Sequence, residues 1–204
     1  NKTQMKVFFF FFFFTCGINA QQLESLKILK IKHDSIETQL KLKYQEEIKG
    51  KSESEISEIY YQNLLSRSKN NRERLDHYFS AVQTFLETQK LIGPSQEAAQ
   101  QEIPDKTANY SQGFPALYKE VHDFIKSQYQ DRLDEFFTKS AKIHFIVQND
   151  DSLYIEKVEG SEKEFNDLAL LAFLMASGKW ESAFQRGMNV KSKFVLPVKF
   201  VVEE

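Results

Sequence analysis

Cysteine, proline and glycine are scarce in this chain. It has one Cys, four Pro and seven Gly among 204 residues. A single cysteine, Cys16, excludes a disulfide within the chain and excludes paired thiols for metal or redox chemistry. Residues 21–92 contain no proline and only one glycine, Gly50, and they are dense in Lys, Glu, Gln and Leu. This composition predicts long helices in the first half of the chain.

The residue patterns that carry catalysis or nucleic-acid binding are missing as well. None of the four histidines has metal-ligand spacing with another ligand; they are His33, His77, His122 and His144. There is no glycine-rich phosphate loop, no Gly-x-Ser-x-Gly and no nucleophile beside a base. With 27 Lys and Arg against 29 Asp and Glu, the chain lacks the clustered positive charge that phosphate binding needs. We therefore expect no enzymatic activity, no metal or other cofactor and no nucleic-acid partner.

The N-terminal segment has the layout of a secretory signal peptide. A positive charge precedes the apolar run Phe8–Phe14, and Ala20 supplies the small residue that cleavage requires. We expect residues 1–20 to be removed by cleavage between Ala20 and Gln21, which predicts a periplasmic or secreted protein. The apolar run is shorter than the ~20 residues that span a membrane. Two alternatives stay open, namely an uncleaved membrane anchor and a lipoprotein with its lipid on Cys16.

Residues 21–93 are expected to form a helical hairpin with coiled-coil-like packing. A coiled-coil-like seam recurs at alternating spacings of three and four residues; it consists of Leu26, Leu29, His33, Ile36 and Leu40. Gly50 ends the first helix, and Ser52 with Glu55 forms a capping box that opens the second. Because so narrow a seam buries little apolar area, the hairpin must pack on something, and a homodimer is one solution.

Two polar stretches interrupt this helical pattern. The first surrounds Asn70 and Asn71 and predicts a break within the second helix. The second covers residues 94–112, which are rich in Gln, Ala and Ser and are predicted to be a linker. Because the linker is short and poor in proline, it does not suit the role of a stiff spacer across the periplasm.

The C-terminal residues 113–204 show the pattern of a small sheet with packed helices. Three strands are expected, at residues 142–148, 153–158 and 193–202. The first two are joined by Asn and Asp residues that favour a hairpin turn. A capping box at Ser161–Glu164 opens a helix between the second and third strands, and Gly178 is expected as its C-cap. The predicted fold class is α+β, with a small antiparallel three-stranded sheet and packed helices, preceded by the helical hairpin.

This C-terminal part resembles the C-terminal domain of the TonB energy-transducer family. The likeness is carried by IHFIVQNDDSLYIEKVEG in the hairpin, by Gly178-Lys179-Trp180 after the helix and by FVLPVKF near the end. It covers about residues 113–204. Family members commonly have Gly where this chain has Asp151, and Pro where it has Ser182. The resemblance implies a TonB C-terminal-like fold and a role in the bacterial envelope.

The resemblance also implies a way of binding. TonB-like domains bind a short segment of an outer-membrane transporter beside the last strand. The corresponding partner-binding residues here would be Lys193, Val195, Pro197, Lys199 and Val201. Pro197 cannot donate to a ladder, which indicates a free edge or a bulge. A free edge can accept a partner strand, although an edge that is merely protected gives the same pattern. Trp180 is expected to be a structural anchor over the core.

Two functions from different classes remain open. The first is a non-enzymatic protein-interaction module of the envelope that binds its partner by edge-strand addition. The second is a structural or scaffold protein that oligomerises through the N-terminal helices. The short apolar segment and the absence of a proline-rich spacer argue against a complete energy transducer.

Overall fold

A computed structural model of the chain describes residues 2–94, 104–128 and 137–202, with residues 2–23, 137 and 202 as backbone only. It combines helices with antiparallel sheets, so the described part of the chain is α+β, as predicted. None of the helices formed by these residues has a stretch long and apolar enough to cross a membrane.

The chain divides into two compact units. One consists of residues 24–81, and the other consists of residues 82–204 together with residues 1–23. The boundary falls within the second long helix, so the last part of that helix belongs with the C-terminal unit. The predicted division into a hairpin, a linker and a C-terminal domain stays a prediction.

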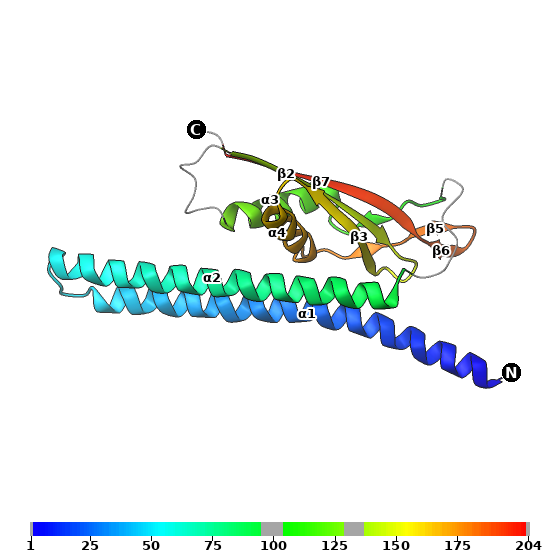
Figure 1. The fold of residues 1–204 in the computed structure, drawn as a ribbon, viewed down its shortest axis with the longest axis horizontal. Coiled ribbons are helices and arrows are strands. Elements are labelled where there is room, and N and C mark those ends of the chain that lie inside the picture. The colour runs from blue at the N-terminus through cyan, green and yellow to red at the C-terminus, as the bar shows by residue number, and fades with distance from the viewer. Residues whose placement is uncertain (1, 95–103, 129–136, 203–204) are drawn as a thin grey trace. The chain divides into compact units, whose positions relative to one another are not determined.

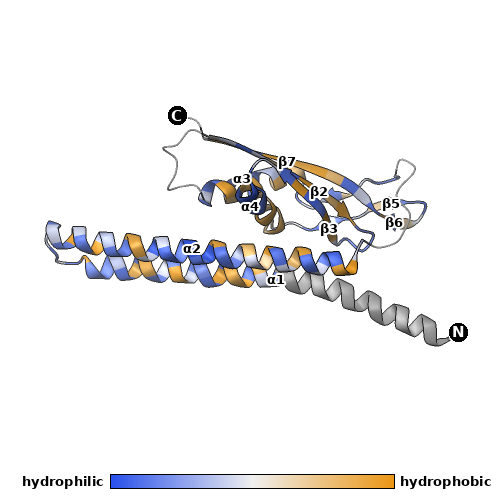
Figure 2. Ribbon diagram, viewed as in Figure 1, coloured by the Kyte–Doolittle hydropathy of each residue, from blue (hydrophilic) through white to orange (hydrophobic). Residues whose placement is uncertain are grey.

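The unit of residues 24–81 is an antiparallel pair of helices (Figure 1). The two helices are α1 (Lys2–Glu47) and α2 (Glu53–Ile92). Arg67 Nε donates a hydrogen bond to Glu37 Oε1 over 2.7 Å, and Asn63 Nδ2 donates to the Leu40 carbonyl over 2.9 Å. Residue numbers therefore rise along one helix as they fall along the other. Apolar residues recur along both helices, as an amphipathic pair requires (Figure 2).

The connection between α1 and α2 contains the glycine and the Ser–Glu pair that the sequence predicts at this turn. Gly50 has a φ of +71°, a left-handed conformation that glycine adopts without steric cost. Glu55 Oε2 accepts hydrogen bonds from the Ser52 backbone N–H over 3.0 Å and from the Ser52 hydroxyl over 2.8 Å. These bonds, together with a bond from Lys51, lower the pKa of the Glu55 carboxyl from 4.5 to about 2. The Glu55 half of the predicted capping box at the start of α2 is therefore confirmed, whereas the Ser52 hydroxyl bonds to the Glu55 carboxylate.

The predicted interruption near Asn70 is wrong, because α2 is one continuous helix. Asn70 is 5% exposed, and its Oδ1 lies 2.9 Å from Nδ1 of His33 on α1. The second ring nitrogen of His33, Nε2, lies 3.1 Å from His77 Nδ1. The polar stretch thus marks a layer where the two helices meet through hydrogen bonds instead of apolar contacts. A polar partner on α1 explains why the helix does not break.

The C-terminal unit is built on a three-stranded antiparallel sheet with the order β3-β2-β7. The strands are β2 (Phe137–Val147), β3 (Leu153–Gly160) and β7 (Ser192–Val202). β2 and β3 form the predicted hairpin, and their register shifts once, between His144 and Phe145, where β3 contains the extra residue Glu156. β2 and β7 pair along their whole length without any irregularity.

Two helices pack on the sheet and on each other (Figure 1). They are α3 (Phe114–Gln128) and α4 (Lys163–Leu174). α3 contributes the buried side chains of Leu117, Val121 and Ile125, which recur every four residues and so form one stripe. α4 is buried almost all round from Leu168 to Leu174, as expected for a helix covered on several sides.

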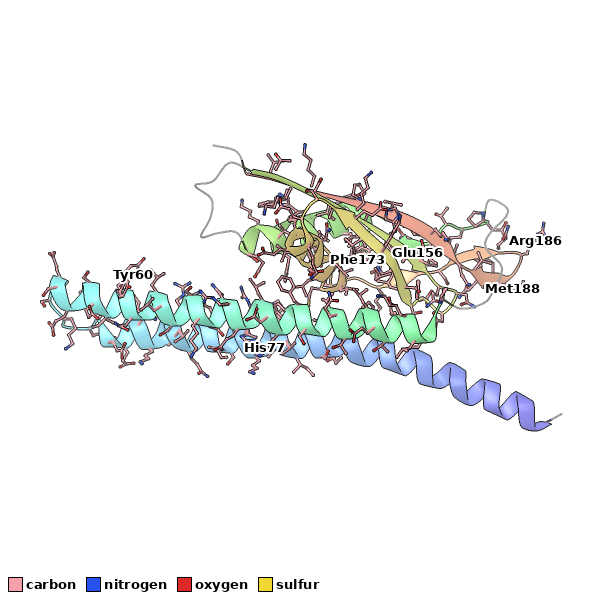
Figure 3. All side chains as sticks on the ribbon, viewed as in Figure 1. Tyr60, His77, Glu156, Phe173, Arg186 and Met188 are labelled. Atoms are coloured by element: carbon pink, nitrogen blue, oxygen red, sulfur yellow. The ribbon has the colours of Figure 1, made fainter. Side chains whose placement is uncertain are left out.

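Four short strands complete the unit. They are β1 (Asn109–Tyr110), β4 (Trp180–Glu181), β5 (Ala183–Gln185) and β6 (Met188–Val190). β1 pairs with β4, and β5 pairs with β6 as a hairpin. Its two-residue turn has Arg186 and Gly187 at positive φ, which is typical of a type I′ turn. Figure 3 shows Arg186 and Met188 at the end of this hairpin.

Both predicted ends of the helix that became α4 need correction. The N-cap is Glu162, without a side-chain capping bond, so the capping box at Ser161 is absent. Instead, the Glu162 carboxylate accepts a hydrogen bond from Lys139 Nζ over 2.7 Å. The C-cap is Met175, with ordinary right-handed backbone, and not Gly178. Gly178 is required for another reason, because a Cβ there would lie 2.3 Å from Cζ of Tyr110.

The end of the segment predicted as a linker is part of the fold. Residues 95–103 lie outside the described ranges, but Lys106 forms a bridge to Phe184, and Ala108 is buried. Tyr110 is 1% exposed, and its hydroxyl accepts a hydrogen bond from the Gly178 N–H over 2.5 Å. Burial raises the pKa of this hydroxyl. Residues 104–112 therefore fasten the start of α3 to the segment that follows α4.

Candidate functional site

The five predicted partner-binding residues share one face of strand β7. Lys193, Val195, Pro197, Lys199 and Val201 are all exposed, whereas Leu196, Val198 and Phe200 between them are buried. This is the alternation of a strand with one face on the core and the other in solvent. The open face carries apolar surface, since Val195 is 52% and Val201 is 37% exposed.

β7 is an edge strand of the sheet. Its inner side pairs with β2, and within the described ranges no strand pairs with its outer side. Pro197 stands opposite Lys142 in a register that contains no bulge. Because proline has no N–H, this ladder is complete only if Pro197 occupies a pair that is not hydrogen-bonded.

The position of Pro197 fixes the direction of its neighbours' backbone groups. Hydrogen-bonded and non-hydrogen-bonded pairs alternate in an antiparallel ladder, so Val195 and Lys199 have the same orientation as Pro197. Their N–H and C=O groups then point away from β2, toward the free edge. These are the groups that an added strand would bind.

The charges on the open face are partly compensated. Lys193 Nζ lies 2.7 Å from Glu156 Oε1, the bulge residue of β3. Glu159 accepts hydrogen bonds from Lys157 and His144, and both lower the pKa of its carboxyl, with Lys157 the larger cause. Lys199 forms no ion pair with any residue that the structure describes. The surface beside the free edge is therefore apolar with unpaired positive charge.

The other edge of the sheet is different. Gln89, near the end of α2, donates from Nε2 to the Leu153 carbonyl over 2.6 Å. Its Oε1 accepts a hydrogen bond from the Ile155 N–H over 2.9 Å. A side chain thus occupies the edge of β3, which leaves the two edges of the sheet unlike. The sequence analysis did not single out Gln89; the available signal was one polar residue in line with the apolar Val82 and Phe85.

Trp180 lies in a cluster of aromatic side chains from the sheet and the segments packed on it. It is 8% exposed, and its ring centroid lies 5.1 Å from Phe145, 5.4 Å from Tyr110 and 5.9 Å from Phe194. These three rings come from β2, β1 and β7. The cluster therefore links the edge strand β7 to the central strand β2 through the contact of Phe194 with Phe145 and Trp180.

The remaining predicted positions form no second site. Ala20 and Gln21 lie on α1, where the structure gives the backbone only, so the cleavage site stays a prediction. No three His, Cys, Asp or Glu side chains of the described residues are grouped so that they could hold a metal ion. His33 and His77 lie side by side, but both nitrogens of His33 are hydrogen-bonded, one to Asn70 and the other to His77.

No protein-family model matches this sequence, and no curated protein or solved structure is significantly similar to it.

Proposed function

We propose that the chain is a non-enzymatic protein-interaction module that binds an extended partner segment along the free edge of β7. The observation that carries this proposal is the unbroken register of β7 across Pro197. It supports outward-facing backbone groups at Val195 and Lys199, flanked by exposed apolar side chains. Main-chain hydrogen bonds would provide the affinity, and the exposed side chains would provide the selectivity.

The partner we propose is a protein of the bacterial envelope, such as a peptide segment of an outer-membrane transporter. Two features of the sequence support this choice, namely the signal-peptide layout of residues 1–20 and the resemblance of residues 113–204 to the TonB C-terminal domain. Both support a location outside the cytoplasm. Intact-mass measurement of the exported protein tests the first feature, since we expect its chain to begin at Gln21. A protein that retains Phe8–Phe14 would contradict this export route.

A scaffold function is the second candidate, and one observation favours it. Among residues 24–81, the only buried apolar side chains are Leu26 and Tyr78, both far from the connection between the helices. Near that connection, several large apolar side chains are about half exposed; they are Leu42, Tyr60, Tyr61, Leu64 and Leu65. A helix pair with so little core gains stability by packing on further helices, and a second copy would supply them.

Site-specific photo-crosslinking separates the two functions. A photoreactive phenylalanine analogue is placed at Val195, on the β7 edge, in the full-length chain in cells. The matched control carries the same group at Tyr118 on α3, an aromatic residue that is 41% exposed. Strand addition predicts a distinct adduct at Val195 that is absent at Tyr118. Identical adducts at both positions, or none at Val195, would contradict it, and an adduct of twice the chain mass from Tyr61 would favour the scaffold.

A further inference from the structure

Gln89 is a buried polar residue whose side-chain hydrogen bonds lie within the C-terminal unit. It is 2% exposed and belongs to the last turn of α2, where its carbonyl accepts a hydrogen bond from the Gly93 N–H over 2.8 Å. Val82 and Phe85, at 0% and 1% exposure, lie on the same helical face. A primary amide in such a stripe is costly unless it is hydrogen-bonded. Gln89 forms two bonds, and both reach strand β3.

The two bonds have the pattern of a parallel β-ladder. The Leu153 carbonyl and the Ile155 N–H flank Tyr154 and point outward from the edge of β3. In a parallel pair of strands, a residue on one strand lies opposite residue j on the other. Its N–H donates to the carbonyl of residue j−1, and its carbonyl accepts from the N–H of residue j+1. The Gln89 amide does this with Nε2 at 2.6 Å and Oε1 at 2.9 Å. It therefore takes the place of one residue of an added strand.

We propose that Gln89 is a latch that closes the β3 edge against strand addition. An uncovered edge presents unpaired N–H and C=O groups, which pair readily with the edges of other chains. With the latch formed, the sheet offers strand addition at β7 and not at β3. When the end of α2 moves away, the β3 edge opens and becomes competent to pair. This inference rests on the contacts of Gln89, and it holds whether or not β7 binds a partner.

The first test replaces Gln89 in the full-length chain. Gln89→Leu keeps a side chain of similar size on the apolar helical face but removes both hydrogen bonds. The control is Gln83→Leu, an exposed glutamine of the same helix. We expect the Ile155 amide proton to exchange roughly tenfold faster in Gln89→Leu, as loss of a single hydrogen bond predicts. Amide protons of the β2–β7 ladder should not change. The variant should also self-associate with rising concentration, whereas Gln83→Leu should behave like the wild type.

A second variant keeps the test decisive if Gln89→Leu does not fold. In Gln89→Glu, an ionised carboxylate can accept from the Ile155 N–H but cannot donate to the Leu153 carbonyl. A protonated carboxyl can do both, as the amide does. We therefore expect the variant to self-associate near neutral pH and to match the wild type at a pH low enough to protonate the carboxyl. Unchanged exchange at Ile155 with no self-association in either folded variant would overturn the latch. Equal effects of Gln83→Leu would overturn it as well.

Discussion

The Asp151 carboxylate accepts a hydrogen bond from the Ser182 backbone N–H, with Oδ1 and N only 2.6 Å apart. Under the proposed resemblance of residues 113–204 to the TonB C-terminal domain, these are the two positions with an unusual residue, with Asp where Gly is common and Ser where Pro is common. A glycine would provide no acceptor, and a proline would provide no donor. The two departures therefore complement each other and fasten the β2–β3 turn to the segment after Trp180. Asp151 adopts this position at a φ of +66°, the conformation for which glycine is preferred.

A double-mutant cycle measures this coupling. Asp151→Gly should cost ~1–3 kcal/mol because the Ser182 N–H, in a residue 7% exposed, loses its acceptor, and relief of the positive φ should offset ~1 kcal/mol of that loss. Combined with Ser182→Pro, the loss should be smaller than the sum of the two single changes by ~1 kcal/mol. Asp151→Asn is the matched control, since it keeps an acceptor and tolerates left-handed backbone. Denaturant unfolding followed by Trp180 fluorescence gives the free energies, and strictly additive values would argue against the coupling.

Gly178 should be intolerant of any side chain. A Cβ at this position would meet Tyr110 Cζ at 2.3 Å, in a ring that is almost fully buried and cannot move aside. We expect Gly178→Ala to cost ~2 kcal/mol or more, as overpacking of a core does. Gly187→Ala is the control. A Cβ at Gly187 would have no neighbour within 4 Å, so this substitution should cost only the ~1 kcal/mol that a positive φ imposes on alanine. Thermal melting compares them, and equal losses would show that contact with Tyr110 is not the reason for glycine.

The helical unit should lose stability in acid through Glu55. The pKa of its carboxyl is about 2 in the folded protein against an ordinary 4.5. A folded-state pKa below the unfolded value means that the contribution is complete above pH 4.5 and is lost as the pH falls toward 2. Glu55→Gln should remove this part of the pH dependence, whereas Glu53→Gln, in the same helical turn, should leave it intact. The helical circular dichroism signal against pH checks this, and identical curves for Glu55→Gln and the wild type would refute it.

The sequence predicted features that depend on neighbouring residues. The break at Gly50, the capping box at Ser52, the β2–β3 hairpin and the alternation of β7 each follow from local spacing. The predicted interruption at Asn70 was wrong because Asn70 is hydrogen-bonded to His33, which lies 37 residues away in the sequence. Gly178 was assigned to a helix end because its actual neighbour, Tyr110, is 68 residues distant. Side chains that meet across such separations leave no pattern in a short window.

In the candidate site, too, features that depend on neighbouring residues were predicted, and contacts between distant residues were not. The five exposed residues of β7 were identified from a period of two and from the resemblance of the C-terminal residues. The role of Gln89 was not identified, since its hydrogen-bond partners on β3 lie 64 and 66 residues away in the sequence. The bond between Asp151 and Ser182 was missed for the same reason, although both residues had been recognised as departures. Their complementarity requires the distance between them, which the sequence does not contain.

Binding by a proline variant of β7 tests the central claim most directly. In Val195→Pro, the outward N–H is removed while the inner ladder with β2 is kept, so the protein should fold. Titration with the segment recovered by crosslinking should show affinity weakened roughly tenfold, as loss of a main-chain hydrogen bond predicts. Val195→Leu, which keeps the N–H, should bind normally, and Lys199→Glu should change binding by ~1 kcal/mol or less. A folded Val195→Pro variant that binds with unchanged affinity would contradict strand addition at β7.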